Sequence, residues 1–413
     1  MTRDEIALAA AQRFGTPLYL YDLTEITARF ERLRAAFGAG FAISYAVKAN
    51  PNGDILAHLI GLGAKIDASS IGEVLHAIAA GADPADISFT GPAKTRAEIA
   101  RAVELGIGTM VLESLRQAEW TSQEATRTGR RAGCVIRINP ASVPRAFGAR
   151  MTGKASQFGI DEDALEETLA RIAALPGIAL DGFHIYAGTN CLDAAGCVEN
   201  FANYARLFRQ FAPGLPEPAR MLIFGTGFGI PYYEDGAPLD LAAVAGPSLA
   251  LARELAGDPA TAPARLVLEL GRWLVGPPGR LLSAVISGKS AGGTELRMCD
   301  AGFNNHLAAC GMMGSVIRRN YRMANLSNPE APRRRYTLTG PLCTSIDMLA
   351  KNIDLPELRE GDVIAVENSG AYGFTSSPHQ FISHPVPREV LWDGTTLRES
   401  RAQPRPRHPG EPA

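Results

Sequence analysis

Short apolar segments alternate with amphipathic helical segments from about residue 41 to residue 272. Eight apolar segments follow one another: FAISYAV, AKIDAS, ISFTG, TMVLE, GCVIRINP, ALDGFHIYAG, RMLIFG and RLVLEL. Between them, stretches such as DILAHLIGLG and SIGEVLHAIAAG place apolar residues at helical spacing. Nearly continuous apolar strands separated by helices are typical of parallel strands buried on both faces. Eight such units in this length predict an α/β fold, a (β/α)8 TIM barrel.

The pattern changes after Arg272. The segments LLSAVISG, ELRMCDAG, RRYTLTGPLC, DVIAVENSG and REVLWDG are β-branched or alternating and are broken by Gly and Pro, which predicts a C-terminal antiparallel β-domain. The early segment PLYLYD is expected to add a strand to that domain. The predicted division is a strand-contributing N-terminal segment at 1–35, a barrel at 36–272, a β-domain at 273–397 and a disordered, Pro- and Arg-rich tail at 398–413.

Composition narrows the classes of partner. The chain has 413 residues, 46% hydrophobic and 20% charged, with a formal net charge of −2, which gives no reason to expect nucleic acid or an anionic membrane as partner. No apolar stretch reaches the length of a membrane span, and the first ten residues lack a signal core. The six cysteines show no CxxC pair and no zinc spacing, so we expect a cytoplasmic protein with free thiols and no structural metal.

Polar residues end nearly every predicted barrel strand. In chain order these are Lys48, Asp67, Thr90, Glu113, Arg137 with Asn139, His184, the loop GTGFG at 225–229, and Glu269 with Arg272 shortly after it. In a TIM barrel the C-terminal strand ends meet at one mouth, which carries the chemistry. The convergence predicts a site for a small ligand.

Several of these residues have an ordinary explanation as well as a functional one. Lys48 is either a strand-end lysine that reaches solvent, the commoner case for a lone lysine, or a partly desolvated amine that attacks a carbonyl. The glycine loop is either a tight turn or a phosphate cradle, because loops after strands seven and eight commonly bind phosphate in barrels. The surrounding residues favour the functional alternative for both.

Glu269 and His184 also each have two possible roles. Glu269 either forms an ion pair with Arg272 or faces the ligand, where a carboxylate beside a pyridine nitrogen would keep that nitrogen protonated and make the ring an electron sink. His184 is either a core histidine or a flat ring that stacks on a planar cofactor. The spacing in the sequence leaves the choice open.

Taken together, the motifs resemble those of a known family. YAVKAN, DASSIGEV, GPAKT, SQFGI, FHIYAG, GTGFGI, ELGR, DAGFN, GPLCTSID and SGAYG occur in this order over nearly the whole chain. The set is similar to that of the pyridoxal-phosphate decarboxylases of the alanine-racemase-like fold (fold type III), typified by diaminopimelate and ornithine decarboxylases. The resemblance implies an enzyme, a carboxy-lyase of biosynthesis that removes the α-carboxylate of an amino acid.

The resemblance also implies roles for individual residues. Lys48 would form the Schiff base with pyridoxal 5'-phosphate, and Asp67 would lie beside it. The other cofactor contacts would be His184 on the ring face, Glu269 at the ring nitrogen, and Gly227, Gly229 and Arg272 at the phosphate. Cys343 and Tyr372 would enter the active site of the partner subunit, which implies a head-to-tail homodimer. There Cys343 would protonate the reacting carbon or shape the pocket, and Arg137, Thr344 and Asp347 would contact substrate.

Three positions depart from the family pattern. Leu270 stands where the family has proline in its EPGR motif, and Tyr186-Ala187-Gly188 replaces the commoner Gly-Ser-Gly, so that one phosphate contact is lost or supplied by Thr189. Thr344 follows Cys343 where diaminopimelate and ornithine decarboxylases have an acid that meets the distal amine. A hydroxyl does not neutralise an ammonium group, and burying that charge unpaired is costly. The substrate is therefore expected to lack a free distal ammonium.

The GPLCTSID and SGAYGFTSSPHQFISHPVPREV segments look similar to a branch that acts on conjugated amino acids, including aminoacyl groups on acyl-carrier proteins and siderophore or antibiotic precursors. The segment from Arg318 to Arg335 holds six arginines, which indicates a solvated loop by default or a surface for an anionic substrate tail or acidic carrier protein.

Four alternatives accompany this hypothesis. They are diaminopimelate decarboxylation in lysine biosynthesis, amino-acid racemisation, a non-catalytic pyridoxal-phosphate protein, and a cofactor-free aldolase that uses Lys48. Glu269 argues against racemisation, which is typical of an arginine at the ring nitrogen. The Cys343 and Tyr372 motifs argue against the non-catalytic proteins, which lack a β-domain.

Overall fold

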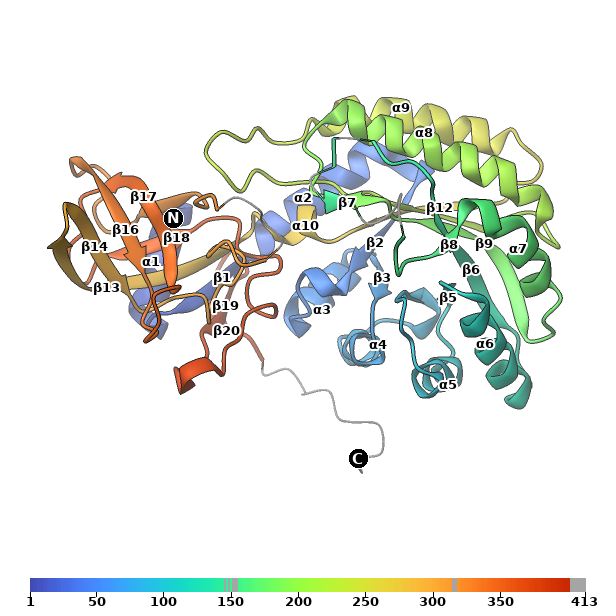
Figure 1. Cartoon of the computed structure of the whole chain (residues 1–413), viewed down its shortest axis with the longest axis horizontal. Helices are drawn as coiled ribbons and strands as arrows, with labels where there is room; N and C mark the ends of the chain where they lie inside the picture. Colours follow the sequence, from blue (N-terminus) through green and yellow to red (C-terminus); the bar gives the residue numbers. More distant parts are fainter. Residues whose placement is uncertain (145, 148, 151–154, 314–317, 402–413) are drawn as a thin grey trace. The chain divides into compact units, whose positions relative to one another are not determined.

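A computed structural model of the chain describes residues 1–144, 146–147, 149–150, 155–313 and 318–401 (Figure 1). These residues form two compact units. The barrel unit comprises Arg29–Gly229 and Pro238–Gly271, and the β unit comprises Met1–Ala28, Ile230–Ala237 and Arg272–Arg401. The tail expected to be disordered lies, from residue 402 on, outside the described residues.

Eight parallel strands form the barrel, and each comes from one of the eight apolar segments. They are β2 (Ala42–Ala46), β3 (Lys65–Ala68), β4 (Ile87–Phe89), β5 (Thr109–Leu112), β6 (Ala132–Asn139), β9 (Ile178–Ile185), β11 (Met221–Gly225) and β12 (Arg265–Leu270). The sheet closes because β5 pairs with β6 and β12 pairs with β2. Val111, Val135, Ile223 and Val267 fill part of its interior. The predicted TIM barrel is confirmed.

Helices follow the strands and surround the barrel in Figure 1. They are α2 (Leu23–Phe37), α3 (Gly53–Gly61), α4 (Ile71–Ala79), α5 (Arg96–Leu105), α6 (Leu115–Arg127), α7 (Leu165–Ala173), α8 (Ala194–Phe211) and α9 (Leu241–Ala256). Their boundaries follow from capping residues. Helix α5, for example, begins after Thr95, which forms a capping box with Glu98, and ends at Gly106 in the left-handed conformation (φ 70°). Short pairings add β8 (Ile160–Asp161) to β6, and β7 (Ala149–Arg150) to β10 (Gly188–Thr189).

The β unit holds a mainly antiparallel sheet, as predicted. Its strands are β1 (Leu18–Asp22), β13 (Gly279–Ala291), β14 (Thr294–Cys299), β15 (Met323–Asn325), β16 (Arg333–Thr339), β17 (Met348–Pro356), β18 (Val363–Val366), β19 (Arg388–Trp392) and β20 (Leu397–Glu399). Strand β1, from PLYLYD, lies between β13 and β19. Its pairing with β19 is parallel, as is that of β14 with β16. Helices α1 (Arg3–Phe14) and α10 (Arg272–Val275) complete the unit, and α1 buries Ile6 and Ala10 against Leu18 and Leu282.

The arginine-rich segment is not one solvated loop, so that default interpretation was wrong. Arg333 to Arg335 form the start of strand β16, which pairs with β17 at the edge of the sheet. There Arg333 forms an ion pair with Asp354 at 2.8 Å, and Arg334 forms one with Glu357 at 3.3 Å. Strand β17 is the edge strand, and Asp354 is one of the charged side chains that protect such an edge from pairing with other chains. Among the described residues, no helix combines the length and apolar character needed to cross a membrane.

Candidate active site

Lys48 lies in a tight turn directly after strand β2, in the 3-10 helix η2 (Val47–Ala49). The hydroxyl of Tyr45 donates to the carbonyl of Asn50 at 2.8 Å, and the Asn50 side chain accepts from the N–H of Asn52 at 3.0 Å, so both ends of the turn are fixed. The Lys48 amine is 3.8 Å from the Asp67 carboxylate and 5.5 Å from the centre of the Tyr186 ring. Its side chain is 38% exposed, which leaves the amine accessible.

Asp67 is completely buried at the end of β3. Thr90 donates to its Oδ1 at 2.6 Å, whereas Oδ2 faces Lys48 and has no hydrogen-bond partner within the described chain. Burial, reinforced by the charge of Glu269, raises the pKa of Asp67 from 3.8 to about 8 against the opposing charge of Lys48. The Asp67 carboxyl therefore holds a proton readily beside the Lys48 amine.

A second lysine, Lys94, lies in the same barrel but has a different environment. Its amine donates to the carbonyls of Gly91 at 2.7 Å and Val111 at 2.8 Å, and only 4% of the residue is exposed. Burial lowers the pKa of Lys94 to about 8. Although that pKa would suit a nucleophile, the amine is committed to two backbone carbonyls. Accessibility therefore favours Lys48 as the reactive lysine.

His184 and Glu269 form a buried pair at the ends of β9 and β12. His184 Nε2 is 2.9 Å from Glu269 Oε2, and the side chains are 0% and 2% exposed. Burial alone would raise the pKa of Glu269, but the charge and hydrogen bond of His184, with the charges of Lys48 and Arg137, lower it to about 2. Glu269 is thus held ionised, and its partner is His184, not the Arg272 considered from the sequence. The Nδ1 of His184 has no hydrogen-bond partner within the described chain.

Arg137, predicted to bind substrate, is 4% exposed and engaged elsewhere. Its guanidinium lies 3.3 Å from the Glu113 carboxylate and 4.5 Å from the centre of the Phe158 ring. Glu113 also accepts the backbone N–H groups of Gly91 at 2.7 Å and Gly159 at 3.1 Å. This network ties neighbouring strand ends together, which favours a structural role for Arg137; a substrate contact stays a prediction.

The glycine loop after β11 is packed tightly against the segment that follows β9. Gly227 has φ +61°, and a Cβ there would lie 2.3 Å from the carbonyl oxygen of Gly188. Its carbonyl accepts from the N–H of Cys191, while the N–H of Gly229 donates to the carbonyl of Cys191 at 2.8 Å. The N–H of Gly229 is therefore occupied in holding the loop, and a contact between Gly227 and a phosphate stays a prediction.

The remaining predicted cofactor contacts, Arg272 and Tyr372, come together in the β unit. The Arg272 guanidinium lies 4.6 Å from the centre of the Tyr372 ring and 5.5 Å from that of Tyr232, and it donates to the Tyr232 hydroxyl at 2.5 Å. Tyr372 has φ +55°, a strained conformation for a residue with a side chain. Such strain is concentrated at functional sites, which agrees with the predicted role of Tyr372.

Cys343, Thr344 and Asp347 share one loop between β16 and β17. Cys343 is an exposed thiol. Asp347 is 3% exposed, and its carboxylate oxygens accept the N–H groups of Phe303 at 2.9 Å and Leu342 at 2.8 Å. Asp347 thus organises the loop that presents Cys343 and Thr344, and its predicted contact with substrate stays a prediction.

Two residues near Lys48 were not predicted from the sequence. Glu73, at the start of α4, accepts the N–H of Ser69 at 2.6 Å; burial raises its pKa, and the charge of Lys48 opposes the rise. Tyr186 lies under the Lys48 amine. Glu73 belongs to the DASSIGEV motif but resembles a helix-capping acid, and Tyr186 differs from the family's Gly-Ser-Gly without any sequence pattern that indicates a contact with Lys48.

Residues 23–276 match the family described as pyridoxal-dependent decarboxylase, pyridoxal binding domain. The chain belongs to this family. It is 31% identical over 396 residues to L-glutamyl-(BtrI acyl-carrier protein) decarboxylase of Niallia circulans, covering 95% of this chain and 92% of the relative. It is 33% identical to the diaminopimelate decarboxylase of Pseudomonas aeruginosa, covering 95% and 91%. The solved diaminopimelate decarboxylase of Helicobacter pylori, complexed with L-lysine, has 29% identity and a TM-score of 0.85, covering 96% of both chains.

This pyridoxal-dependent decarboxylase uses pyridoxal phosphate as its cofactor, and the residues at the barrel mouth fit that group. Lys48 offers an accessible amine, Glu269 an ionised carboxylate and Gly227 a backbone N–H. Buried polar atoms of Asp67 and His184 are left without hydrogen-bond partners in the described structure, as expected of a site that is completed by a polar ligand.

Proposed function

We propose that the enzyme removes the α-carboxylate of an amino acid whose side chain is conjugated, as on an acyl-carrier protein. Pyridoxal phosphate, when bound, supplies the electron sink for the cleavage. Lys48 would hold the cofactor covalently, and the buried Asp67 carboxyl would hold a proton beside the Lys48 amine. Glu269 would keep a proton on the ring nitrogen, His184 would cover the ring face, and the Gly227 N–H would bind the phosphate.

Other proposed roles lie in the β unit. Arg272 adds a charged contact to the phosphate, and Tyr372 contacts the cofactor. The Cys343 thiol delivers a proton to the reacting carbon or shapes its surroundings, while Thr344 faces the substrate side chain. Gly229 holds the glycine loop in shape.

The observation that carries the substrate proposal is the content of the Cys343 loop. In residues 340–347 the single carboxylate is Asp347, and both of its oxygens accept backbone N–H groups. Thr344 offers a hydroxyl where an acid would be needed to balance a distal ammonium. Because the α-carboxylate must be free to leave as CO2, the conjugate must be attached through the side chain. The 31% identity to a carrier-protein glutamyl decarboxylase supports this class of substrate.

Diaminopimelate decarboxylation is the second candidate, favoured by the 33% identity to the Pseudomonas aeruginosa enzyme. Its substrate carries an ammonium group at the distal end. The two candidates therefore differ in the charge that Thr344 has to meet.

The deciding experiment measures CO2 release by the holoenzyme from meso-diaminopimelate, free glutamate and a glutamate side-chain thioester. We expect the thioester to have a kcat/KM at least about tenfold above that of diaminopimelate, because an unpaired ammonium costs more than about 1.4 kcal/mol. Thr344→Asp should raise the kcat/KM for diaminopimelate, and the neutral isostere Thr344→Asn should not. Faster turnover of diaminopimelate by the unmodified enzyme would overturn the proposal.

We also propose a cytoplasmic head-to-tail homodimer whose subunits share active sites. The β unit exposes several large apolar side chains, namely Met312, Met313, Ile346, Phe381, Ile382 and Val386. Large exposed apolar side chains are what an interface with another subunit would cover, which supports this proposal. Ile346 belongs to the Cys343 loop, so an interface there would carry Cys343 toward a partner subunit. The unpaired state of all six cysteines fits a reducing compartment.

A further inference from the structure

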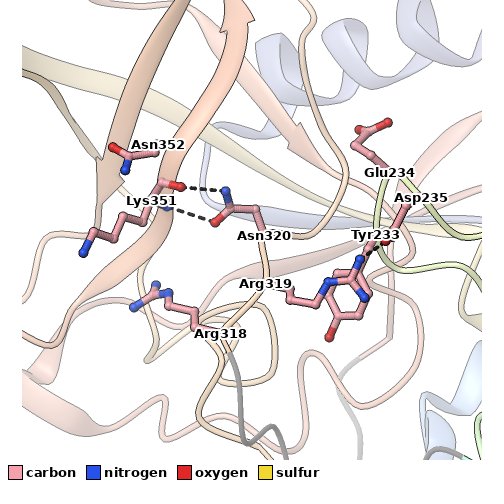
Figure 2. A pocket seen from close by; sticks show the side chains of 8 residues that line it. All are labelled: Tyr233, Glu234, Asp235, Arg318, Arg319, Asn320, Lys351 and Asn352. Atoms are coloured by element: carbon pink, nitrogen blue, oxygen red, sulfur yellow. Dashed lines mark hydrogen bonds and ion pairs between the residues drawn. The ribbon is translucent and has the colours of Figure 1, made fainter.

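A cavity of about 430 Å³ lies in the β unit, where the loop leading to β15 meets strand β17 (Figure 2). Arg318, Arg319 and Lys351 supply its cationic side chains, and Glu234 and Asp235 its anionic ones. Its volume is in the range of small-ligand sites.

One wall is fixed by a reciprocal pair of hydrogen bonds. The side-chain amide of Asn320 donates to the carbonyl of Lys351 at 2.8 Å, and its oxygen accepts the N–H of Lys351 at 2.9 Å. Lys351 and Asn352 together oppose Thr337, which makes a β-bulge, and Asn352 has φ +51°. Bulges redirect side chains and are frequent beside functional sites. Here the bulge places Lys351 and Asn352 on the cavity.

The opposite wall is fixed by Arg322. Its guanidinium donates to the carbonyls of Tyr233 at 3.0 Å, Glu234 at 3.2 Å and Gly236 at 2.8 Å. On this wall Arg319 forms an ion pair with Asp235 and stacks 4.1 Å from the centre of the Tyr233 ring. The charges of Arg319 and Asp235 thus cancel each other.

Arg318 and Lys351 are the cations that remain to bind a ligand. Arg318 donates one N–H to the carbonyl of Met348, while its buried Nε has no hydrogen-bond partner within the described residues. Figure 2 shows Arg318 and Lys351 extending to the same side of the cavity, with Glu234 near the Arg319–Asp235 pair on the other. A guanidinium and an ammonium group that line one cavity are an arrangement that suits an oxyanion.

Within the β unit, Arg318 also links the cavity to the loop that carries Cys343 and Thr344. The carbonyl that it binds belongs to Met348, the first residue of β17 and the residue after the 340–347 loop that carries Cys343 and Thr344. A long substrate that contacts Thr344 could therefore also reach Arg318, because Met348 lies only a few residues after Thr344 in the sequence.

We propose that this cavity binds the phosphate of the phosphopantetheine arm by which a carrier protein holds the substrate. The proposal rests on the carrier-linked substrate proposed above. Arg318 and Lys351 bind the phosphate oxygens, and Asn352, which also lines the cavity, offers a further amide donor. The site recognises the carrier arm, which leaves Thr344 to contact the amino-acid side chain.

The test compares two substrates that differ only in the phosphate: the glutamate side-chain thioesters of phosphopantetheine and of pantetheine. For the unmodified holoenzyme we expect the phosphate to raise kcat/KM about tenfold, mainly through KM, because charge-assisted hydrogen bonds to one anion have that order of effect. Lys351→Glu should reduce the ratio to less than about twofold while turnover of the pantetheine thioester is kept. The Asn320 bonds involve only the Lys351 backbone, so they are retained.

Lys289→Glu is the matched control, because Lys289 is also an exposed lysine of the β unit, on strand β13. This variant should keep the tenfold ratio, and added salt should lower the ratio in both it and the unmodified enzyme. An unchanged ratio in Lys351→Glu overturns the cavity as the phosphate site. Turnover of both thioesters with no phosphate effect in the unmodified enzyme also overturns it, and leaves the proposed function standing. No turnover of either thioester overturns the proposed function, and this inference with it.

Discussion

Lys48 and Asp67 face each other across 3.8 Å at the ends of neighbouring barrel strands, with the amine accessible and the carboxylate fully buried. Burial raises the pKa of Asp67 to about 8, so the carboxyl stays ready to hold a proton beside the amine. The arrangement places a buried titratable group next to an exposed nucleophile, which is typical of a catalytic site.

Replacing Asp67 by Asn should change how stability depends on pH. The folded-state pKa of Asp67 lies above its ordinary value of 3.8, at about 8, so only the folded state holds this proton between those pH values. Stability of the cofactor-free enzyme should therefore fall as pH rises through this window, and Asp67→Asn should remove that contribution. The measurement is the Tm of both proteins from pH 5 to pH 8. A Tm difference that stays constant over this range would contradict the pKa assignment.

Glu269 and Glu113 are both buried carboxylates, yet their substitution should have different effects. Glu269→Gln should lower kcat about 100-fold with little change in KM, because the charge that keeps the cofactor ring protonated is lost. Glu113→Gln should instead lower the free energy of unfolding by about 3 kcal/mol, because Arg137 is left as an unpaired buried charge. Steady-state kinetics and thermal unfolding of both variants separate the two roles. An equal loss of kcat in both would show that the pairing of Glu113 with Arg137 serves catalysis as well.

Gly227→Ala should weaken binding of pyridoxal phosphate. The new Cβ would clash with the carbonyl oxygen of Gly188, 2.3 Å away, and shift the loop whose N–H is proposed to meet the phosphate. Gly292→Ala is the control, because Gly292 has a similar φ of +56° in open space, so the variant carries the backbone strain without the clash. Titration of the apoenzyme with pyridoxal phosphate should show a raised Kd for Gly227→Ala alone. Equal affinities would remove Gly227 from the phosphate site.

Mixed subunits test the shared active site. Lys48→Ala and Cys343→Ala should each be inactive alone, but if each site takes Lys48 from one subunit and Cys343 from the other, a mixed dimer has one intact site. Unfolding and refolding an equal mixture should then restore about a quarter of the unmodified activity. No recovery, with dimers confirmed by light scattering, would place both residues in the same subunit's site.

The barrel was predictable because its strands are buried on both faces and therefore form continuous apolar segments. Strand β17 was not, since Lys351 and Asn352 interrupt its alternation with a bulge. The short edge strands β15 and β20 contain too few residues for a periodic pattern.

The site was predictable only in part. Strand-end position identified Lys48, Asp67, His184 and Glu269, because strand ends converge in any TIM barrel. The sequence did not predict which of these side chains contact each other. Arg272 is three residues from Glu269 in sequence, yet Glu269 pairs with His184, which comes from another strand. The engagement of Arg137 with Glu113 likewise depends on contacts between strands, which no local pattern records.

The central claim is that Lys48 carries the cofactor, and reductive trapping tests it most directly. Borohydride treatment of the holoenzyme fixes pyridoxal phosphate to the lysine that holds it, and peptide mass spectrometry then identifies that residue. We predict the modification on Lys48 and its loss, together with the visible absorption of the bound cofactor, in Lys48→Ala. Modification of Lys94, the buried barrel lysine whose pKa is lowered to about 8, or of no lysine at all, would contradict the account.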